Sequence, residues 1–210
     1  MTGDGADPAA KAQQPHRPLS RVLIELSETV GERVTLEQLA NAFGDRSFGA
    51  LLVLFAAPNL LPLPPGASTI FGIPLIIVAA QLIIGRPRVW LPAFISRRSI
   101  DGATFKTIAH KVEPTLQRFE RAIRPRYWPF HRAVADLLVG ALALVLAIVL
   151  SLPIVFGNWL PSLSIVIISL ALMERDGLWL AAGVAVAIAA VAVVGAVVGG
   201  LAVAAVHFLF

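Results

Sequence analysis

Three long stretches of this chain contain no ionisable side chain, and they constrain the fold more than any other feature. They cover residues 47–85, 137–173 and 177–206. A helix needs about 20 mostly apolar residues to cross a bilayer, so each stretch is long enough to be embedded in a membrane. With 57% hydrophobic and only 14% charged residues, the chain has too little polar surface to cover one aqueous core. We therefore predict an all-α fold, that of a polytopic α-helical membrane protein.

The first stretch cannot be one simple transmembrane helix, because residues 58–66 contain four prolines. Proline removes a backbone donor and clashes with the preceding turn, so a helix does not continue through such a run. This leaves one arm over 47–57 and another over 67–85, of which only the second approaches the thickness of the hydrocarbon layer, about 30 Å. We expect residues 47–85 to form a proline-broken, re-entrant-like segment.

A second broken segment is predicted over residues 133–173, where residues 151–158 interrupt the helical pattern. Both breaks contain the tetrapeptide Asn-X-Leu-Pro, beginning at Asn59 and at Asn158. In both copies, serine residues, an apolar arm, an arginine and a Trp-Leu pair follow in the same order. This recurrence indicates an internal structural repeat of the kind found in transporters, and it leaves open whether the two copies are inverted or parallel.

The N-terminal part is expected to lie outside the membrane. Residues 1–18 have no apolar signal region and are predicted to be a disordered tail. Residues 19–46 are predicted to form a cytoplasmic amphipathic helical hairpin. Apolar residues recur at helical spacing from Leu19, and Thr35 with Gln38 has the pattern of a capping box at the start of the second helix. Everything from residue 47 to residue 210 is assigned to a membrane domain.

Positive charge is concentrated in one segment. Residues 86–132 hold eleven of the seventeen Lys and Arg residues, against three acids. Basic residues beside membrane segments mark the cytoplasmic side and attract anionic lipid, so we expect a multi-pass protein of the bacterial inner membrane with this segment in the cytoplasm. Within it, residues 100–126 are predicted to form an interfacial amphipathic helix. Residues 177–206 are predicted to be a C-terminal transmembrane helix.

The two breaks are the predicted functional site. An unpaired backbone group in hydrocarbon costs several kcal/mol, so non-helical backbone persists there only inside protein or beside a water-filled cavity. Broken helix ends also carry partial charges with which transporters hold ions or polar solutes. The alternative is that the Asn and Ser side chains only cap freed backbone groups. The predicted substrate-binding residues are Asn59, Pro62, Pro64, Pro65, Gly66, Ser68, Thr69, Asn158, Pro161, Ser162 and Ser164.

Other classes of site lack their signatures. There is no Gly-X-Ser-X-Gly elbow, phosphate-binding glycine loop or His-Glu-X-X-His motif, so we expect no enzyme, no catalytic residue and no cofactor. The four histidines lack metal-ligand spacing and cysteine is absent, so no metal site is expected. No nucleic-acid-binding motif accompanies the basic segment, so nucleic acid is not an expected partner.

Several motifs of the chain resemble the bacterial ExoD family of exopolysaccharide-synthesis proteins. They are Thr35-Leu-Glu-Gln-Leu-Ala40, Gly44-Asp-Arg-Ser-Phe-Gly49, the proline-rich run from Pro58 to Ser68, and Gly72-Ile-Pro-Leu75. The similarity extends from about residue 20 to about residue 205. It implies an inner-membrane protein associated with exopolysaccharide production, without an established catalytic residue or transported substrate.

Two functional hypotheses follow from the residues and the resemblance together. The first is transporter-like or channel-like passage of a small ion or lipid-linked solute at the paired broken helices. The second is a non-transporting assembly or regulatory partner of the polysaccharide-synthesis machinery, which docks through the basic segment 97–126. Membrane lipids are expected partners under both hypotheses, and a homo-oligomer and polysaccharide-synthesis proteins are the other candidate partners.

Overall fold

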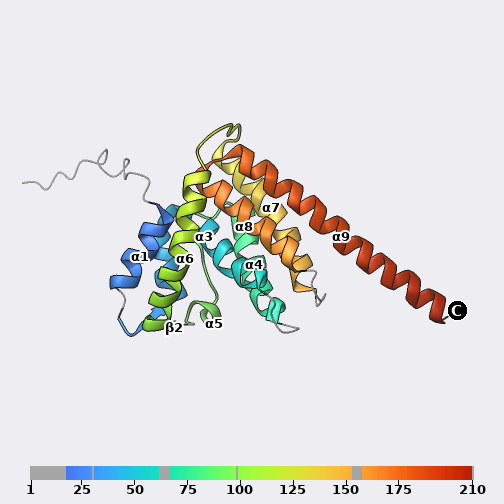
Figure 1. The fold of residues 1–210 in the computed structure, drawn as a ribbon, viewed down its shortest axis with the longest axis horizontal. Coiled ribbons are helices and arrows are strands. Elements are labelled where there is room, and N and C mark those ends of the chain that lie inside the picture. The colour runs from blue at the N-terminus through green and yellow to red at the C-terminus, as the bar shows by residue number, and fades with distance from the viewer. Residues whose placement is uncertain (1–17, 30, 62–66, 98, 153–157, 210) are drawn as a thin grey trace, which may run out of the picture.

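The fold is described from a computed structural model, which covers residues 18–29, 31–61, 67–97, 99–152 and 158–209. Most of the predicted tail and the predicted turn residues Pro62, Pro64, Pro65 and Gly66 lie outside the described residues. The protein is helical, with one small two-stranded sheet, and the predicted all-α class is confirmed (Figure 1). The elements in chain order are α1 (Leu19–Thr29), β1 (Arg33–Thr35), α2 (Leu36–Phe43), η2 (Gly44–Arg46), α3 (Ser47–Ala56), η3 (Ala57–Leu60), α4 (Ala67–Ile83), α5 (Ala93–Ser96), β2 (Ser99–Asp101), α6 (Gly102–Ala122), α7 (Arg132–Ser151), α8 (Trp159–Glu174) and α9 (Gly177–Leu209).

Four apolar helices form two hairpins that pack on each other. The first hairpin is α3–η3 with α4, and the second is α7 with α8. Across the hairpins, α4 packs along α7 and α3 packs along α8, so the four helices close into a ring. Its centre is filled by aliphatic side chains that are almost fully buried, such as Leu52, Leu75, Leu146 and Ile165. In a bilayer, the close van der Waals packing of these side chains helps to hold the two hairpins together.

The described helices end and begin at the edges of the two predicted breaks; the central residues of both breaks lie outside the described part of the chain, so the broken segments stay predictions. The helical chain stops at Leu60 and resumes at Ala67, and it stops at Ser151 and resumes at Trp159. The predicted internal repeat corresponds to these two hairpins, and it stays a prediction from the recurring tetrapeptide.

Among the described residues, three helical stretches are long and apolar enough to cross a membrane, which is compatible with a membrane protein. They are residues 36–60, 132–151 and 177–200. The remaining two apolar helices, over 68–83 and 159–174, are shorter. The last helix, α9, packs along α8 and then continues away from the bundle (Figure 1).

A second layer is built from the N-terminal part and the basic segment. Helix α1 packs against α6, and β1 pairs antiparallel with β2, so that Val34 lies opposite Ile100. The carboxylate of Glu120 in α6 accepts hydrogen bonds from the backbone N–H of Ser20 (2.8 Å) and from its hydroxyl (2.6 Å) at the start of α1. The predicted capping box is present, because the Thr35 hydroxyl accepts from the Gln38 N–H at 3.2 Å and the Gln38 side chain accepts from the Thr35 N–H at 2.9 Å. The predicted pair of N-terminal helices therefore forms, but α6 and a short sheet complete its layer.

Candidate functional site

The two hairpins meet through polar side chains at the ends where their helices break. The Nδ2 of Asn158, just before α8, donates a hydrogen bond of 2.7 Å to the Oγ of Ser68 at the start of α4. The hydroxyl of Thr69 donates to the backbone oxygen of Ser151, the last residue of α7, at 3.2 Å. Residues from both predicted breaks are therefore brought together. We call this region the hairpin junction and define it as Asn59, Ser68, Thr69, Ser151, Asn158 and Ser162.

Asn59 is buried in η3 and only half of its amide is used. Its Nδ2 donates to the backbone oxygen of Phe55 at 3.0 Å and, more weakly, to that of Ala56 at 3.5 Å. These contacts cap carbonyl groups that the end of α3 leaves free. Its Oδ1 is buried and has no hydrogen-bond partner among the described residues. Capping therefore explains the amide nitrogen of Asn59 but not its oxygen.

Two buried serine hydroxyls on α8 also lack a partner within the part of the chain that the structure describes. They belong to Ser162 and Ser169, which are both fully buried. The two residues are seven positions apart and so lie on the same face of α8, two turns from each other. An unsatisfied buried polar group costs roughly 1–3 kcal/mol, so three such oxygens in one helix bundle need an explanation.

The pairing of α3 with α8 places Asn59 and Ser162 at the same level of the bundle. Gly49, near the start of α3, lies beside Met173 and the backbone oxygen of Ser169, near the end of α8. From Gly49 the chain advances ten residues to Asn59, about 15 Å along the helix. The same distance back along α8 from Met173 leads to the neighbourhood of Ser162, and η3 does pack against α8.

Close packing at the junction depends on Gly72 of α4. A Cβ atom built there would collide with the Oγ of Ser151, whose hydroxyl donates to the backbone oxygen of Ala147 at 2.8 Å. Ser151 was not among the predicted site residues. The signal available in the sequence was its position directly before a Leu-Pro dipeptide, which predicts the end of a helix.

The remaining predicted residues have other roles. The hydroxyl of Ser164 donates to the backbone oxygen of Gly183 at 2.8 Å, so this serine joins α8 to α9 and not to the junction. Pro161 is buried in the first turn of α8, where a missing N–H is tolerated. Gln81, in the last turn of α4, is satisfied by the backbone of Trp90: its Nε2 donates to the Trp90 oxygen at 2.8 Å and its Oε1 accepts from the Trp90 N–H at 2.7 Å.

The opposite end of the bundle is charged. Three ion pairs join the starts of α3 and α7, the end of α8, and the segments before α7 and α9. They are Arg46–Glu174 (2.9 Å), Asp45–Arg132 (3.9 Å) and Arg126–Asp176 (3.1 Å). Within the described ranges, no group of three His, Asp or Glu side chains is arranged to hold a metal ion. The bundle therefore has an uncharged end, which contains the junction, and a charged end.

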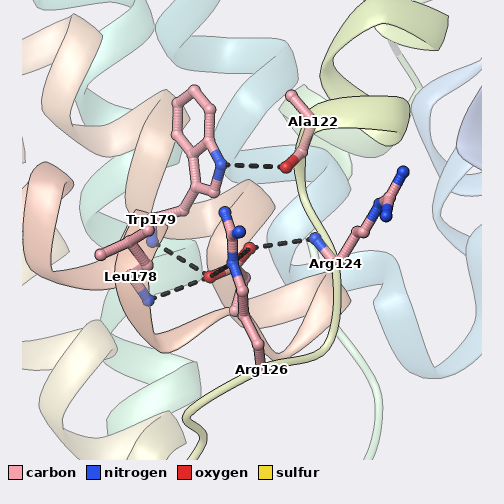
Figure 2. Close-up of polar contacts among 6 residues, drawn as sticks. Ala122, Arg124, Arg126, Leu178 and Trp179 are labelled. Atoms are coloured by element: carbon pink, nitrogen blue, oxygen red, sulfur yellow. Dashed lines mark hydrogen bonds and ion pairs between the residues drawn. The ribbon is translucent and has the colours of Figure 1, made fainter.

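Asp176 is the most strongly bound carboxylate at the charged end. It is fully buried and caps the start of α9, accepting from the N–H of Leu178 at 2.9 Å and of Trp179 at 3.2 Å (Figure 2). It also accepts from the backbone N–H of Arg124 at 2.9 Å and from the Nε of Arg126 at 3.1 Å (Figure 2). Burial by itself raises the pKa of the Asp176 carboxyl. The donors that point at it outweigh the burial and hold that pKa below its ordinary value of 3.8.

Comparison with known proteins gives one family and two relatives. Residues 19–196 match the family described as "Exopolysaccharide synthesis, ExoD". The chain is 35% identical over 159 residues to an uncharacterized protein of Synechocystis sp.. The aligned residues cover 74% of this chain and 74% of that protein. The chain is also 30% identical over 173 residues to Protein ExoD of Rhizobium meliloti. The aligned residues cover 80% of this chain and 72% of that protein. No solved structure matches the chain.

Proposed function

Because the chain belongs to the ExoD family and so has a role in exopolysaccharide synthesis, we propose that it acts as an inner-membrane protein whose hairpin junction gives passage to a small ion or lipid-linked solute. The observation that carries the proposal is the set of buried oxygens without a partner among the described residues, two of them at the junction and one two turns further along α8. They are the Oδ1 of Asn59 and the hydroxyls of Ser162 and Ser169. Polar atoms inside an apolar bundle are costly, and they persist where a polar species visits them.

The length of α8 supports a re-entrant path for the arm of the second hairpin that this helix forms. Helices α8 and α9 leave the same charged turn and pack side by side. Helix α8 has 16 residues and so extends about 24 Å. The hydrocarbon layer is about 30 Å thick, and α9 is long enough to cross it. If α9 spans the bilayer, the junction at the far end of α8 stops several ångströms short of the opposite surface.

The chemistry of the junction favours a cation or a hydroxyl-bearing solute. Among the described residues, the buried polar atoms of the junction that lack a partner are uncharged oxygens, which accept hydrogen bonds or coordinate cations. The C-terminal ends of η3 and α7 and the N-terminal ends of α4 and α8 all lie there, so partial charges of both signs face the junction. No carboxylate belongs to the junction as defined, so direct proton relay is not part of the proposal.

The distribution of charge supports one orientation. The basic segment 86–132 lies between the two hairpins and adjoins the charged end of the bundle, through Arg126 and Arg132. Positive residues stay on the cytoplasmic side, so the charged end faces the cytoplasm and the junction lies towards the outer surface. Membrane lipids surround the bundle in this arrangement.

The test is flux through the purified full-length protein in liposomes, with a matched pair of serine variants. Ser162→Ala removes an unpartnered hydroxyl, so it should reduce flux severalfold while the free energy of unfolding stays within about 0.5 kcal/mol of the wild type. Ser164→Ala removes the bond to Gly183, so it should destabilise the protein by about 1 kcal/mol and leave flux per folded molecule unchanged. Absence of ion, proton or lipid flux from a folded protein would overturn the proposal.

The alternative function is a non-transporting assembly or regulatory partner of the polysaccharide-synthesis machinery. It is favoured by exposed basic side chains on α6 that form no ion pair among the described residues, such as Lys106, Lys111 and Arg118. Replacement of Arg118, Arg121 and Arg124 by Gln should then abolish exopolysaccharide production, while substitutions of Asn59 and Asn158 should be mild. Arg126 is left out of this set because it also holds Asp176.

A further inference from the structure

Helix α6 carries two apolar lines, and only one of them is covered by protein. Phe105, Ala109 and Ile123 are buried, on the side where α1 packs. Ile108 and Val112 belong to a second line and remain 47% and 42% exposed. Two large aliphatic side chains so exposed on an otherwise charged helix indicate a surface that meets an apolar environment.

The side of α6 that carries the second apolar line contacts the first turn of α9. Phe119 lies eleven residues after Ile108, which is three turns further along the same side of the helix. Its ring packs edge-on against the ring of Trp179, in the first turn of α9, with 6.2 Å between the centroids. The Nε1 of Trp179 also donates to the backbone oxygen of Ala122 at 3.4 Å (Figure 2). The side of α6 that contains Ile108 is thereby fixed towards the entry of α9 into the bilayer.

Charged residues border this line on one side only. Lys111 and Arg118 are seven residues apart and so share one side of the helix, about 60–80° around its axis from Ile108. Both are exposed, and neither forms an ion pair within the described part of the chain. Lys106 and Arg121 lie on the opposite face of the helix, also exposed.

We propose that α6 lies in the head-group layer of an anionic bilayer surface. Ile108 and Val112 enter the boundary of the acyl chains, while Lys111 and Arg118 bind lipid phosphates. Figure 1 shows α6 running crosswise to α9, the direction that such a surface helix takes beside a spanning one. A membrane is favoured over a protein partner because the contact of Phe119 with Trp179 holds the helix at the surface of the bilayer that α9 crosses. The proposal is independent of solute passage.

The experiment uses the full chain, which contains no cysteine and therefore accepts a single label. An environment-sensitive fluorophore is attached at Ile108→Cys or, on the opposite face, at Gln117→Cys. Each protein is placed in bilayers of phosphatidylcholine alone or of phosphatidylcholine with phosphatidylglycerol. With phosphatidylglycerol, the label at position 108 should shift to the blue and become severalfold less accessible to acrylamide, while the label at 117 should stay in water.

Two charge variants with the same net charge separate lipid binding from a general effect. Lys111→Gln with Arg118→Gln should weaken the protection at position 108, because each cation near an anionic surface changes binding roughly fivefold. Lys106→Gln with Arg121→Gln, on the opposite face, should leave it nearly unchanged. Equal loss in both variants, equal protection in bilayers without phosphatidylglycerol, or protection that appears only in native membranes would each overturn the proposal, and the last would indicate a protein partner.

Discussion

Asn158 donates a 2.7 Å hydrogen bond to Ser68, a residue 90 positions earlier in the chain, and so joins the beginnings of α8 and α4. The two residues come from different copies of the predicted repeat. Asn158 begins the second Asn-X-Leu-Pro tetrapeptide, and Ser68 follows the first. The side chain of Asn158 therefore bonds across the hairpins and does not cap its own helix, α8.

The first prediction concerns the strength of this bond. Asn158→Ala and Ser68→Ala should each destabilise the protein by about 1 kcal/mol, and the double variant should cost little more than either single one, because both remove the same bond. The coupling free energy from a double-mutant cycle should be about 0.6–2 kcal/mol, as for other hydrogen bonds between membrane helices. Reversible unfolding of the protein in bicelles measures it.

A control for this cycle pairs Ser68→Ala with Thr107→Ala on α6. The hydroxyl of Thr107 bonds within its own helix, to the backbone oxygen of Ala103, so it shares no partner with Ser68. These two changes should be additive within about 0.5 kcal/mol. Additivity of the Asn158 and Ser68 changes as well would mean that the two side chains do not interact.

The second prediction concerns the buried charge at the start of α9. Asp176→Asn keeps the shape of the side chain but removes the charge that Arg126 and three backbone N–H groups surround, so it should destabilise the protein by about 3 kcal/mol. The control is Asp45→Asn. Asp45 is 87% exposed and its pair with Arg132 is 3.9 Å long, so this change should cost less than about 1 kcal/mol. Similar losses for both variants would contradict the role assigned to burial.

The third prediction is a loss of stability in acid that depends on the same carboxylate. The pKa of Asp176 is lower in the folded protein than its ordinary value of 3.8, so the unfolded chain takes up the proton first as the pH falls. The stabilisation is complete from about pH 5 upward and is lost progressively as the pH falls through the ordinary pKa and then through the lower folded pKa. The difference in unfolding free energy between the wild type and Asp176→Asn should therefore shrink over that range. A difference that stays constant would exclude Asp176 as its source.

Much of the fold follows from local sequence signals. The prolines of residues 58–66 predict that an α-helix ends before them and another begins after them; α3 ends at Ala56 and α4 begins at Ala67. The capping box at Thr35 places the start of α2 correctly. The absence of charge over 177–206 predicts α9, which starts at the same residue. In each case a few neighbouring residues decide the backbone conformation.

The site was predicted less completely because its contacts join distant parts of the chain. The sequence predicted Ser164 as a site residue together with the other polar residues of the second break, but its hydroxyl bonds to α9. Which side of α8 faces the junction depends on the helices that pack around it, and the local sequence does not determine this. Asp176 was not among the predicted site residues. Its partner Arg124 is 52 residues away, and no local pattern indicates that pairing. The three-residue strands β1 and β2 are too short to produce a periodic pattern.

The fourth prediction tests how tightly the start of α9 is packed, with two glycines of the same helix. Gly177 donates its N–H to the backbone oxygen of Arg126 at 2.9 Å, and a Cβ atom built on it would collide with the backbone oxygen of Tyr127. Since backbone cannot turn aside as a side chain can, Gly177→Ala should displace the 126–127 segment and destabilise the protein by roughly 1–3 kcal/mol.

Gly195→Ala is the matched change further along α9. Nothing lies within 4 Å of a Cβ atom at that position, and alanine is the better helix former by up to about 1 kcal/mol, so this variant should be neutral or slightly more stable. Thermal unfolding in the same detergent compares the two variants directly. Because the collision at Gly177 involves the segment that supplies Arg126 to Asp176, Gly177→Ala should also reduce the acid sensitivity of stability, whereas Gly195→Ala should retain it. If Gly177→Ala kept both wild-type stability and acid sensitivity, the contact between the 126–127 segment and α9 would not be as close as described.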